Sequence, residues 1–366
     1  MTAQGGTRSK RLASVRHRLP RRNRRVAQST TRGFVVRERR STLWSRLVER
    51  VGVAAYRMAG AMLGRLPEGP AAHVLGWVTQ ATYLLWPGRR RRANLNFGHV
   101  LGLPPDDPAV RALALAAYRN YARYLVELMR LPRIPLEVAA QRVEPHGIET
   151  VMEAWREAGS LILAVAHVGN NEYVAAGLAS RGWPVSVLAD DTGFPEMFEL
   201  LRRERERWGV RIIPWRNIRE IYGVLRRGEM LGLLVDWGYR PDGIPVRLFD
   251  AWTTLPAGPA VLAAKTGATI LPVVVRRRPD GTFLVTHDEP IRVASSAPAD
   301  LKQATQAIAD ALERTIAAAP EQWYSFKSMW PEPAEAQAAA PADLMPGAPH
   351  GLPQAVVEVV SGGEGA

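Results

Sequence analysis

The chain has 366 residues, of which 47% are hydrophobic and 23% are charged, and this balance is typical of a folded globular protein. It contains no cysteine, which excludes disulfide bonds, a thiolate nucleophile and a thiolate zinc site. Residues 1–40 hold 13 Lys/Arg and a single acid, whereas the rest of the chain has 35 basic and 34 acidic residues. Of the net charge of +13, +12 therefore belongs to the N-terminal segment and +1 to the body of the protein.

Residues 1–40 are predicted to be a disordered basic tail. Such a segment is attracted to the phosphates of nucleic acids and of an anionic bilayer alike. Its few aromatic residues disfavour stacking on bases, and a leader without function is a third interpretation. We expect neither a secretory signal peptide nor an apolar run long enough to span a bilayer.

Residues 41–140 are predicted to be helical, with amphipathic patterns over Leu43–Leu66 and Val74–Trp86 and a further helix over Ala109–Leu131. The first two helices are expected to associate with a membrane surface, and simple packing on the rest of the domain is the alternative. The residues that suit lipid headgroups are the aromatic Trp44, Trp77, Tyr83 and Trp86, together with the arginines of the block 89–92.

Residues 141–334 alternate short apolar runs with helices. This pattern predicts an α/β fold with a mixed, largely parallel sheet flanked by helices. Residues 335–366 are rich in Ala, Pro and Gly and are predicted to be disordered. The expected strands are Leu161–Ala166, Val185–Ala189, Val210–Ile213, Met230–Val235 and Thr269–Val275, with edge strands at Phe283–Thr286 and Ile291–Val293.

One pair of residues has the spacing of a general base and its orienting acid. His167 directly follows the first predicted strand, where sites form in α/β sheets, and Glu172 lies in the first turn of the next helix. We expect Glu172 to hydrogen-bond one ring nitrogen, which leaves the other to remove a proton from a hydroxyl. A surface histidine followed by an acid that complements the helix dipole is the alternative. Asn170 and Asn171 are candidates to bind an oxyanion or an acceptor phosphate, and no metal site is expected.

Several segments occur in an order and spacing that resemble a known enzyme family. They are RANL at 92–95, GIE at 147–149, AHVGNNE at 166–172, ERERWG at 204–209, RRGEMLGLLVDWGYRPDG at 226–243, TLPAGPAVLAAKTGATILPVVVRRRPDG at 254–281 and APEQW at 319–323. Over about residues 41–330 the chain resembles the bacterial lipid A late acyltransferases (lauroyl and myristoyl transferases) and the related phosphatidylinositol mannoside acyltransferases.

The resemblance implies roles for four residues. It makes His167 the general base and Glu172 its orienting acid. Arg207 falls where the family has an arginine implicated in catalysis or anionic substrate binding, and Asp236 falls on the aspartate of the family's second motif. A solvated helix face is the alternative for Arg207, and a helix N-cap is the alternative for Asp236.

The implied activity is that of an O-acyltransferase without a cofactor. It would move a fatty acyl chain from acyl-CoA or acyl carrier protein to a hydroxyl of a membrane lipid or glycolipid. We expect peripheral attachment to an anionic membrane surface, at the cytoplasmic face of the plasma (inner) membrane, and no nucleic-acid partner. After the PEQ segment at 320–322, lipid A enzymes have an arginine-rich stretch, whereas the corresponding stretch of this chain has the single basic residue Lys327. In this respect the chain departs from the lipid A branch.

Two other functions are kept as alternatives. A non-catalytic membrane-binding protein of the same fold would have His167 and Glu172 out of contact. A nucleic-acid-binding protein would depend on the basic tail of residues 1–40, and deletion of that tail would abolish its main function.

Overall fold

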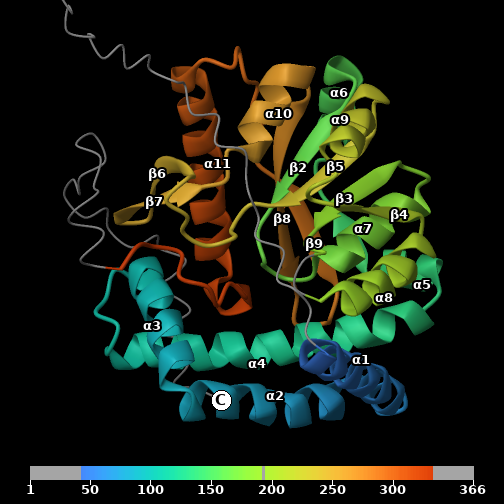
Figure 1. Ribbon diagram of the computed structural model, residues 1–366, viewed down its shortest axis with the longest axis vertical. Coiled ribbons are helices and arrows are strands. Elements are labelled where there is room, and N and C mark those ends of the chain that lie inside the picture. Colours follow the sequence, from blue (N-terminus) through green and yellow to red (C-terminus); the bar gives the residue numbers. More distant parts are fainter. Residues whose placement is uncertain (1–42, 192–193, 333–366) are drawn as a thin grey trace, which may run out of the picture. The chain divides into compact units, whose positions relative to one another are not determined.

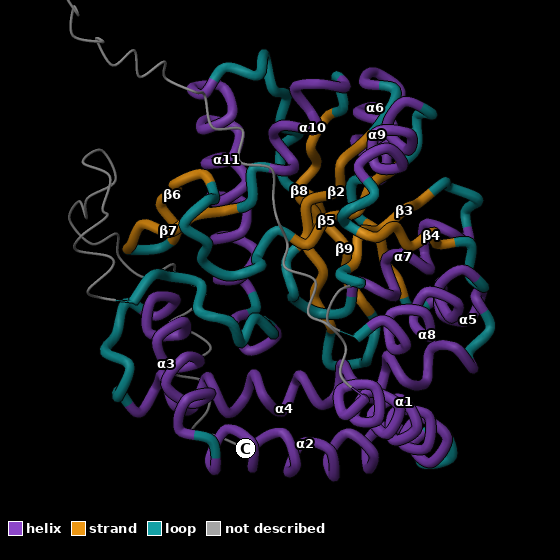
Figure 2. The backbone as a smooth tube through the Cα atoms, in the orientation of Figure 1, coloured by secondary structure: helices purple, strands orange, loops and turns teal. Residues whose placement is uncertain are grey.

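The computed structural model describes residues 43–191 and 194–332, so both predicted tails lie outside the described residues. All described residues from Trp44 onward belong to one compact unit. Figure 1 shows its central sheet between two groups of helices, with long helices running below one edge of the sheet, and Figure 2 shows the strands gathered at the centre.

Seven strands form the central sheet, in the order β1-β9-β8-β2-β5-β3-β4. Neighbouring strands are parallel except for β8 and β9, which pair antiparallel. The predicted α/β class with a mixed, largely parallel sheet is therefore confirmed. The strands are β1 (Val143–Pro145), β2 (Leu161–Val165), β3 (Val185–Ala189), β4 (Val210–Pro214), β5 (Met230–Leu234), β8 (Thr269–Arg277) and β9 (Phe283–His287), and a separate antiparallel hairpin joins β6 (Ile244–Leu248) to β7 (Ala251–Leu255).

The apolar runs predict every strand of the central sheet except β1. Phe283–Thr286 forms a strand as expected, but this strand, β9, lies between β1 and β8 and not at an edge of the sheet. Ile291–Val293 is not a strand, because only an isolated bridge from Ile291 to Ile270 forms there, and that prediction is wrong. The sequence pattern does not predict β1, which has three residues and ends in a proline, or the hairpin β6–β7. These segments mix polar and apolar residues, so they lack the continuous apolar run of a central strand.

Helices cover both faces of the sheet because successive side chains of each strand point to opposite faces. Ile162 on β2 lies in one core cluster with helices α9 to α11, whereas Leu161 and Leu163 lie in a second cluster with α6 and α7. The helices around the sheet are α5 (Leu136–Gln141), α6 (Ile148–Ala158), α7 (Asn171–Ser180), α8 (Pro195–Glu206), α9 (Ile218–Arg226), α10 (Gly258–Thr266) and α11 (Pro298–Ala318), with short 3-10 turns at Leu131–Arg133 and Pro320–Gln322.

The N-terminal part of the described chain is helical, as predicted, and forms α1 (Leu43–Leu63), α2 (Glu68–Leu85), α3 (Pro87–Leu101) and α4 (Pro108–Arg130). Asp107 caps α4 by accepting a hydrogen bond from the backbone N of Ala109 at 2.8 Å. Helices α2 and α4 are joined by a hydrogen bond from Oγ1 of Thr79 to the carbonyl of Tyr118 at 2.7 Å. In Figure 1 these two helices run side by side below the sheet.

Helices α1 and α2 expose an apolar surface. Trp77 is 71% exposed, and Met62 and Leu85 are similarly open to solvent. Tyr83 was expected at the same surface, but it is buried and donates a hydrogen bond to Oδ1 of Asn94 at 2.9 Å, so that expectation is wrong. Among the described residues, every helix is too short or too polar to cross a bilayer.

Candidate active site

His167 and Asp236 meet at the carboxyl edge of the central sheet. His167 follows β2 and Asp236 follows β5, and these two strands are parallel neighbours. Nδ1 of His167 lies 2.7 Å from Oδ1 of Asp236, although the two residues are 69 positions apart in the sequence. Parallel strands that lie side by side end at the same edge, so the topology brings the pair together.

The carboxylate of Asp236 is buried and hydrogen-bonded through both oxygens. Its Oδ2 atom accepts hydrogen bonds from the backbone N of His167 and from Nε1 of Trp323, each at 2.9 Å. Its Oδ1 atom faces Nδ1 of the imidazole, which therefore carries a proton and donates it. This arrangement fixes both the position of the carboxylate and the tautomer of His167.

The two side chains shift each other's protonation. Burial lowers the pKa of His167, but the charge of Asp236 and its hydrogen bond together raise that pKa above its usual value. Burial acts to raise the pKa of Asp236, yet the charge and hydrogen bonds of His167 bring it below its usual range. The imidazole remains 38% exposed, and its Nε2 atom has no hydrogen bond to any described residue. That nitrogen is free to take a proton from a substrate.

A tight turn and a C-terminal segment hold the backbone around His167. Gly169 has φ +63°, and a Cβ atom there would lie 2.5 Å from the carbonyl oxygen of Val275, so only glycine fits. Trp323 forms an isolated β-bridge with Val168, and the backbone N of Tyr324 donates to the carbonyl of His167 at 2.8 Å. The segment that supplies the indole for Asp236 thus also fixes the histidine.

The sequence matches the family described as bacterial lipid A biosynthesis acyltransferase over residues 41–332. The chain belongs to this family. It is 27% identical over 282 residues to a phosphatidylinositol mannoside acyltransferase of Mycolicibacterium smegmatis, a match that covers 76% of this chain and 89% of the relative. It is 26% identical over 286 residues to an enzyme with the same name from Mycobacterium tuberculosis, covering 75% of this chain and 87% of the relative.

Membership of the family confirms two predictions from the sequence, the resemblance itself and the enzyme class. The protein is an O-acyltransferase of lipid biosynthesis, and its substrates are an acyl donor and a lipid or glycolipid acceptor. In this acyltransferase, His167 is the histidine of the AHVGNNE segment at 166–172.

The structure gives Glu172 a different partner from the one expected. Its carboxylate binds the guanidinium of Arg205 on α8 through both oxygens, with Nε 2.7 Å from Oε2. The expected hydrogen bond from Glu172 to His167 is not formed, and in this respect the prediction is wrong. A lack of contact between His167 and Glu172 was expected for a non-catalytic protein of this fold. His167 nevertheless has a carboxylate partner, because Asp236 occupies the position beside the ring where Glu172 was expected.

Arg207 and Arg205, at the C-terminal end of α8, have different environments. Arg207 is the C-cap of α8, and its exposed side chain pairs with Glu204 of the same helix at 3.2 Å. Arg205 instead points inward and is largely buried against Glu172. The charged run ERER therefore places one arginine against Glu172 and the other in solvent, a difference that spacing alone does not reveal. Substrate binding by Arg207 stays a prediction.

The two asparagines after Gly169 shape the turn. Asn170 is fully buried and caps α7 by accepting from the backbone N of Glu172 at 3.1 Å, and substrate binding by Asn170 stays a prediction. Asn171 donates to the carbonyl of Ala166 at 2.8 Å. Substrate binding by Asn171 stays a prediction.

Lys327 is a basic residue beside the His167–Asp236 pair. Its Nζ lies 4.0 Å from the centre of the Trp237 ring, and its charge acts to lower the pKa of His167. Within residues 43–191 and 194–332, no group of three or more His, Asp or Glu side chains is placed to hold a metal ion.

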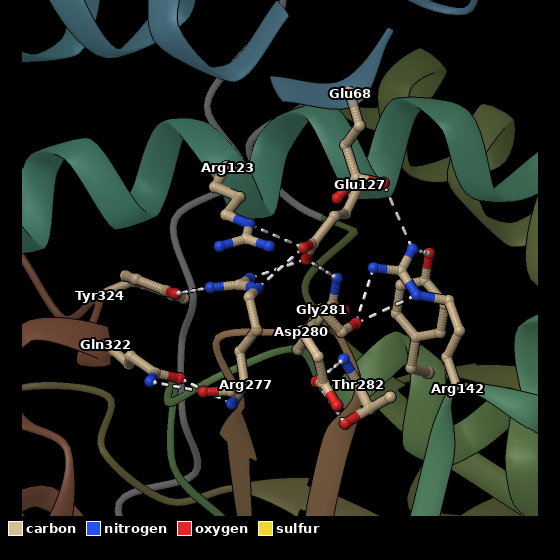
Figure 3. Close-up of polar contacts among 12 residues, drawn as sticks. Glu68, Arg123, Glu127, Arg142, Arg277, Asp280, Gly281, Thr282, Gln322 and Tyr324 are labelled. Atoms are coloured by element: carbon tan, nitrogen blue, oxygen red, sulfur yellow. Dashed lines mark hydrogen bonds and ion pairs between the residues drawn. The ribbon is translucent and has the colours of Figure 1, made fainter. Parts of the chain in front are cut away.

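A buried ion pair links α4 to the end of β8, and the sequence does not predict it. Nε and one terminal nitrogen of Arg277 each lie 2.7 Å from an oxygen of Glu127, and both side chains are almost fully buried (Figure 3). Nδ2 of Asn170 donates to the same carboxylate at 2.9 Å. The pair therefore connects α4 to the residue that caps α7, next to His167. Arg277 lies in the run RRR at 276–278, which alone suggests a solvated strand end.

Glu127→Gln is expected to lower the free energy of unfolding by about 3–5 kcal/mol, because Arg277 is left buried without its counter-charge. Urea denaturation followed by circular dichroism measures this change. Glu157→Gln, which removes an exposed partner of Arg292, is the matched control and should cost about 0–1 kcal/mol. Equal losses in the two variants would contradict a dominant role for the buried pair.

Proposed function

We propose that this acyltransferase moves a fatty acyl chain from an acyl thioester to a hydroxyl of a membrane glycolipid, with a phosphatidylinositol mannoside as the first candidate acceptor. The observation that carries the proposal is the His167–Asp236 pair, with Nδ1 held at 2.7 Å and Nε2 open. The relatives named above are phosphatidylinositol mannoside acyltransferases, which supports this acceptor class. The single Lys327 in place of an arginine-rich ending supports it as well.

In the proposed reaction, Nε2 of His167 removes the proton of the acceptor hydroxyl while the hydroxyl oxygen attacks the thioester carbonyl carbon. The new carbon–oxygen bond gives a tetrahedral oxyanion, whose collapse breaks the carbon–sulfur bond. The imidazolium then returns its proton to the leaving thiolate. Asp236 stabilises the imidazolium and keeps the ring oriented. Direct attack needs no protein nucleophile, in accordance with a chain that has no cysteine.

The donor in this proposal is acyl-CoA or acyl carrier protein, and no cofactor takes part. Lys327 brings a positive charge beside the pair, which favours the negative charge that develops on the carbonyl oxygen. Backbone N–H groups at the start of α7 are further candidates to stabilise that oxyanion.

We further propose that helices α1 and α2 attach the enzyme to the cytoplasmic face of the plasma membrane. Their exposed apolar residues include Met62, Trp77 and Leu85. Exposed apolar surface of this extent is characteristic of a membrane or protein contact, and Trp is favoured at the headgroup level. Arg89 lies over the ring of the exposed Trp86, at 5.2 Å from its centre, where it can meet lipid phosphates.

The acceptor is tested by incubating the full chain with radiolabelled palmitoyl-CoA and either a phosphatidylinositol mannoside or an under-acylated lipid A precursor. We expect the mannoside to be acylated at least tenfold faster, and acyl carrier protein loaded with palmitate is compared as the donor in parallel. Preference for the lipid A precursor would contradict the acceptor. No transfer from either donor to either acceptor would contradict the proposed function.

A further inference from the structure

A cavity of about 720 Å³ lies between helices α2 and α4 and the turn that joins β8 to β9. This volume is in the range of small-molecule sites. Its walls combine basic residues with polar and apolar ones: Arg119, Arg123 and Arg142 line it, together with Glu68, Trp77 and Gly281. Figure 3 shows Arg123, Arg142 and Gly281 of this cavity gathered beside the buried Glu127–Arg277 pair.

Two of the three arginines have hydrogen-bond donors to spare. Arg142 is fully engaged: it donates to the carbonyl of Gly281 at 2.7 Å, to the hydroxyl of Tyr173 at 2.9 Å and to Glu68 at 3.3 Å. Arg123, by contrast, has one ion pair within the described part of the chain, at 3.6 Å from Glu127. That carboxylate is already bound through both oxygens to Arg277.

Arg119 is the freer of the two. It is exposed at the cavity wall and makes no hydrogen bond or ion pair with any residue in 43–191 or 194–332. It lies one helical turn from Arg123 on α4, so both guanidinium groups extend from the same face of the helix. Guanidinium groups with free donors bind phosphate oxygens well, and a pair of them suits a phosphodiester.

The acids of the cavity are engaged elsewhere. Glu68 pairs with Arg142, and Oδ1 of Asp280 accepts hydrogen bonds from the backbone N and the hydroxyl of Thr282 at 2.8 and 2.7 Å. Neither Glu68 nor Asp280 pairs with Arg119 or Arg123 among the described residues, and the carboxylate near Arg123, that of Glu127, is shared with Arg277. Glu68 and Asp280 offer acceptor oxygens for the hydroxyls of a polyol.

This cavity is separate from the catalytic pair. Arg119 and Arg123 lie on one face of α4, whereas Tyr121 and Tyr124 lie on another and contact Tyr324, with ring centres 5.8 and 5.4 Å apart. Tyr324 is the residue whose backbone N holds His167. The cavity lining includes none of His167, Asp236 and Tyr324, so the cavity is not part of the site already described.

The cavity wall reaches the apolar surface of α2. Trp77 lines the cavity and is also 71% exposed, among the exposed Val74 and Val78. A ligand with its phosphate on the arginines could leave the cavity past Trp77 onto that surface. The expected ligand thus has an anionic head and an apolar tail.

We propose that this cavity binds the phosphate-bearing head group of an anionic membrane phospholipid, distinct from the acceptor that is acylated. Its phosphodiester pairs with Arg119 and Arg123, its head-group hydroxyls lie near Glu68, and its acyl chains pass Trp77 into the bilayer. This proposal rests on the membrane attachment proposed above. A lipid held in this way fixes how α2 and α4 lie on the membrane.

Binding of monomeric dihexanoylphosphatidylglycerol to the full chain, measured by calorimetry, tests this site. We expect Arg119→Gln to weaken binding at least tenfold and Arg123→Gln to weaken it similarly. Arg111→Gln removes the same charge from an exposed position two helical turns earlier on α4 and should leave binding within twofold. Dihexanoylphosphatidylcholine, which lacks net charge, and glycerol 3-phosphate, which lacks the chains, should each bind at least tenfold more weakly.

The outcomes distinguish binding of the lipid from general charge attraction and from binding of free phosphate. They also distinguish a failure of the lipid site from a failure of the proposed acyl transfer. Equal losses in Arg119→Gln and Arg111→Gln would mean attraction to overall charge, and glycerol 3-phosphate binding as tightly as the lipid would mean a free-phosphate site. Either result, or no lipid binding, overturns the proposal. His167→Ala should bind the lipid like the wild type. If it does and the wild type transfers no acyl chain, the lipid site stands and the proposed function fails.

Discussion

Replacing His167 with alanine is expected to lower kcat for acyl transfer about 100- to 10,000-fold, the usual contribution of a general base. The reason is geometric, because His167 has one ring nitrogen hydrogen-bonded to a buried carboxylate and the other open at this edge of the sheet. Without that nitrogen, the acceptor hydroxyl must lose its proton to water. The measurement is the initial rate of transfer from radiolabelled palmitoyl-CoA to the glycolipid acceptor.

His146→Ala is the matched control for this prediction. His146 also pairs with an acid, Glu144 at 2.8 Å, but it lies at the surface beside β1. We expect this variant to keep its activity within about a factor of two, and both variants should keep the wild-type circular dichroism spectrum. If His167→Ala retained most of the wild-type rate while remaining folded, His167 would not be the base.

The sequence predicts the central strands of the fold because strands that are buried on both faces consist of apolar residues. Strands β2, β5 and β8 are covered on both faces, so they read as continuous apolar runs, and His167 is recognisable at the end of one of them. The hairpin β6–β7 has no such run, since segments such as IPVRL mix polar and apolar residues. The short strand β1 and the hairpin β6–β7 depend on tertiary contacts that the local pattern does not encode.

The sequence identifies Asp236 as a candidate site residue, but it does not show that Asp236 is the hydrogen-bond partner of His167. Spacing favours Glu172, five positions away, whereas Asp236 becomes a neighbour only because β2 and β5 lie side by side. Strand order is a property of the whole sheet, and no local spacing contains it. For the same reason the sequence does not predict the role of Trp323. Its indole donates a hydrogen bond to the carboxylate of Asp236, although the two residues are 87 positions apart.

Asp236→Asn is expected to reduce kcat about 1,000- to 10,000-fold with little change in fold, because it reverses the tautomer of His167. Oδ2 of Asp236 accepts from two fixed donors, the backbone N of His167 and Nε1 of Trp323. An asparagine must keep its carbonyl oxygen at that position, since its NH2 group would face two N–H groups. The NH2 group is then directed at Nδ1 and donates to it, which moves the ring proton onto Nε2. The nitrogen that should accept the proton is then blocked; in serine proteases the same change costs about 10⁴-fold.

The pH dependence of the rate distinguishes this cause from a general loss of structure. In the wild type, the base must be neutral, so kcat/KM should rise with pH through a midpoint above about 6.5, because Asp236 raises the pKa of His167. In Asp236→Asn the charge is gone and burial still lowers the pKa, so the midpoint should move to lower pH while the plateau falls. Asp250→Asn is the control, since Asp250 bonds Nδ1 of His99 at 2.7 Å in an exposed pair, and it should change neither midpoint nor plateau. If Asp236→Asn left both the midpoint and the plateau of the kcat/KM pH profile unchanged, the carboxylate of Asp236 would not be what orients the base.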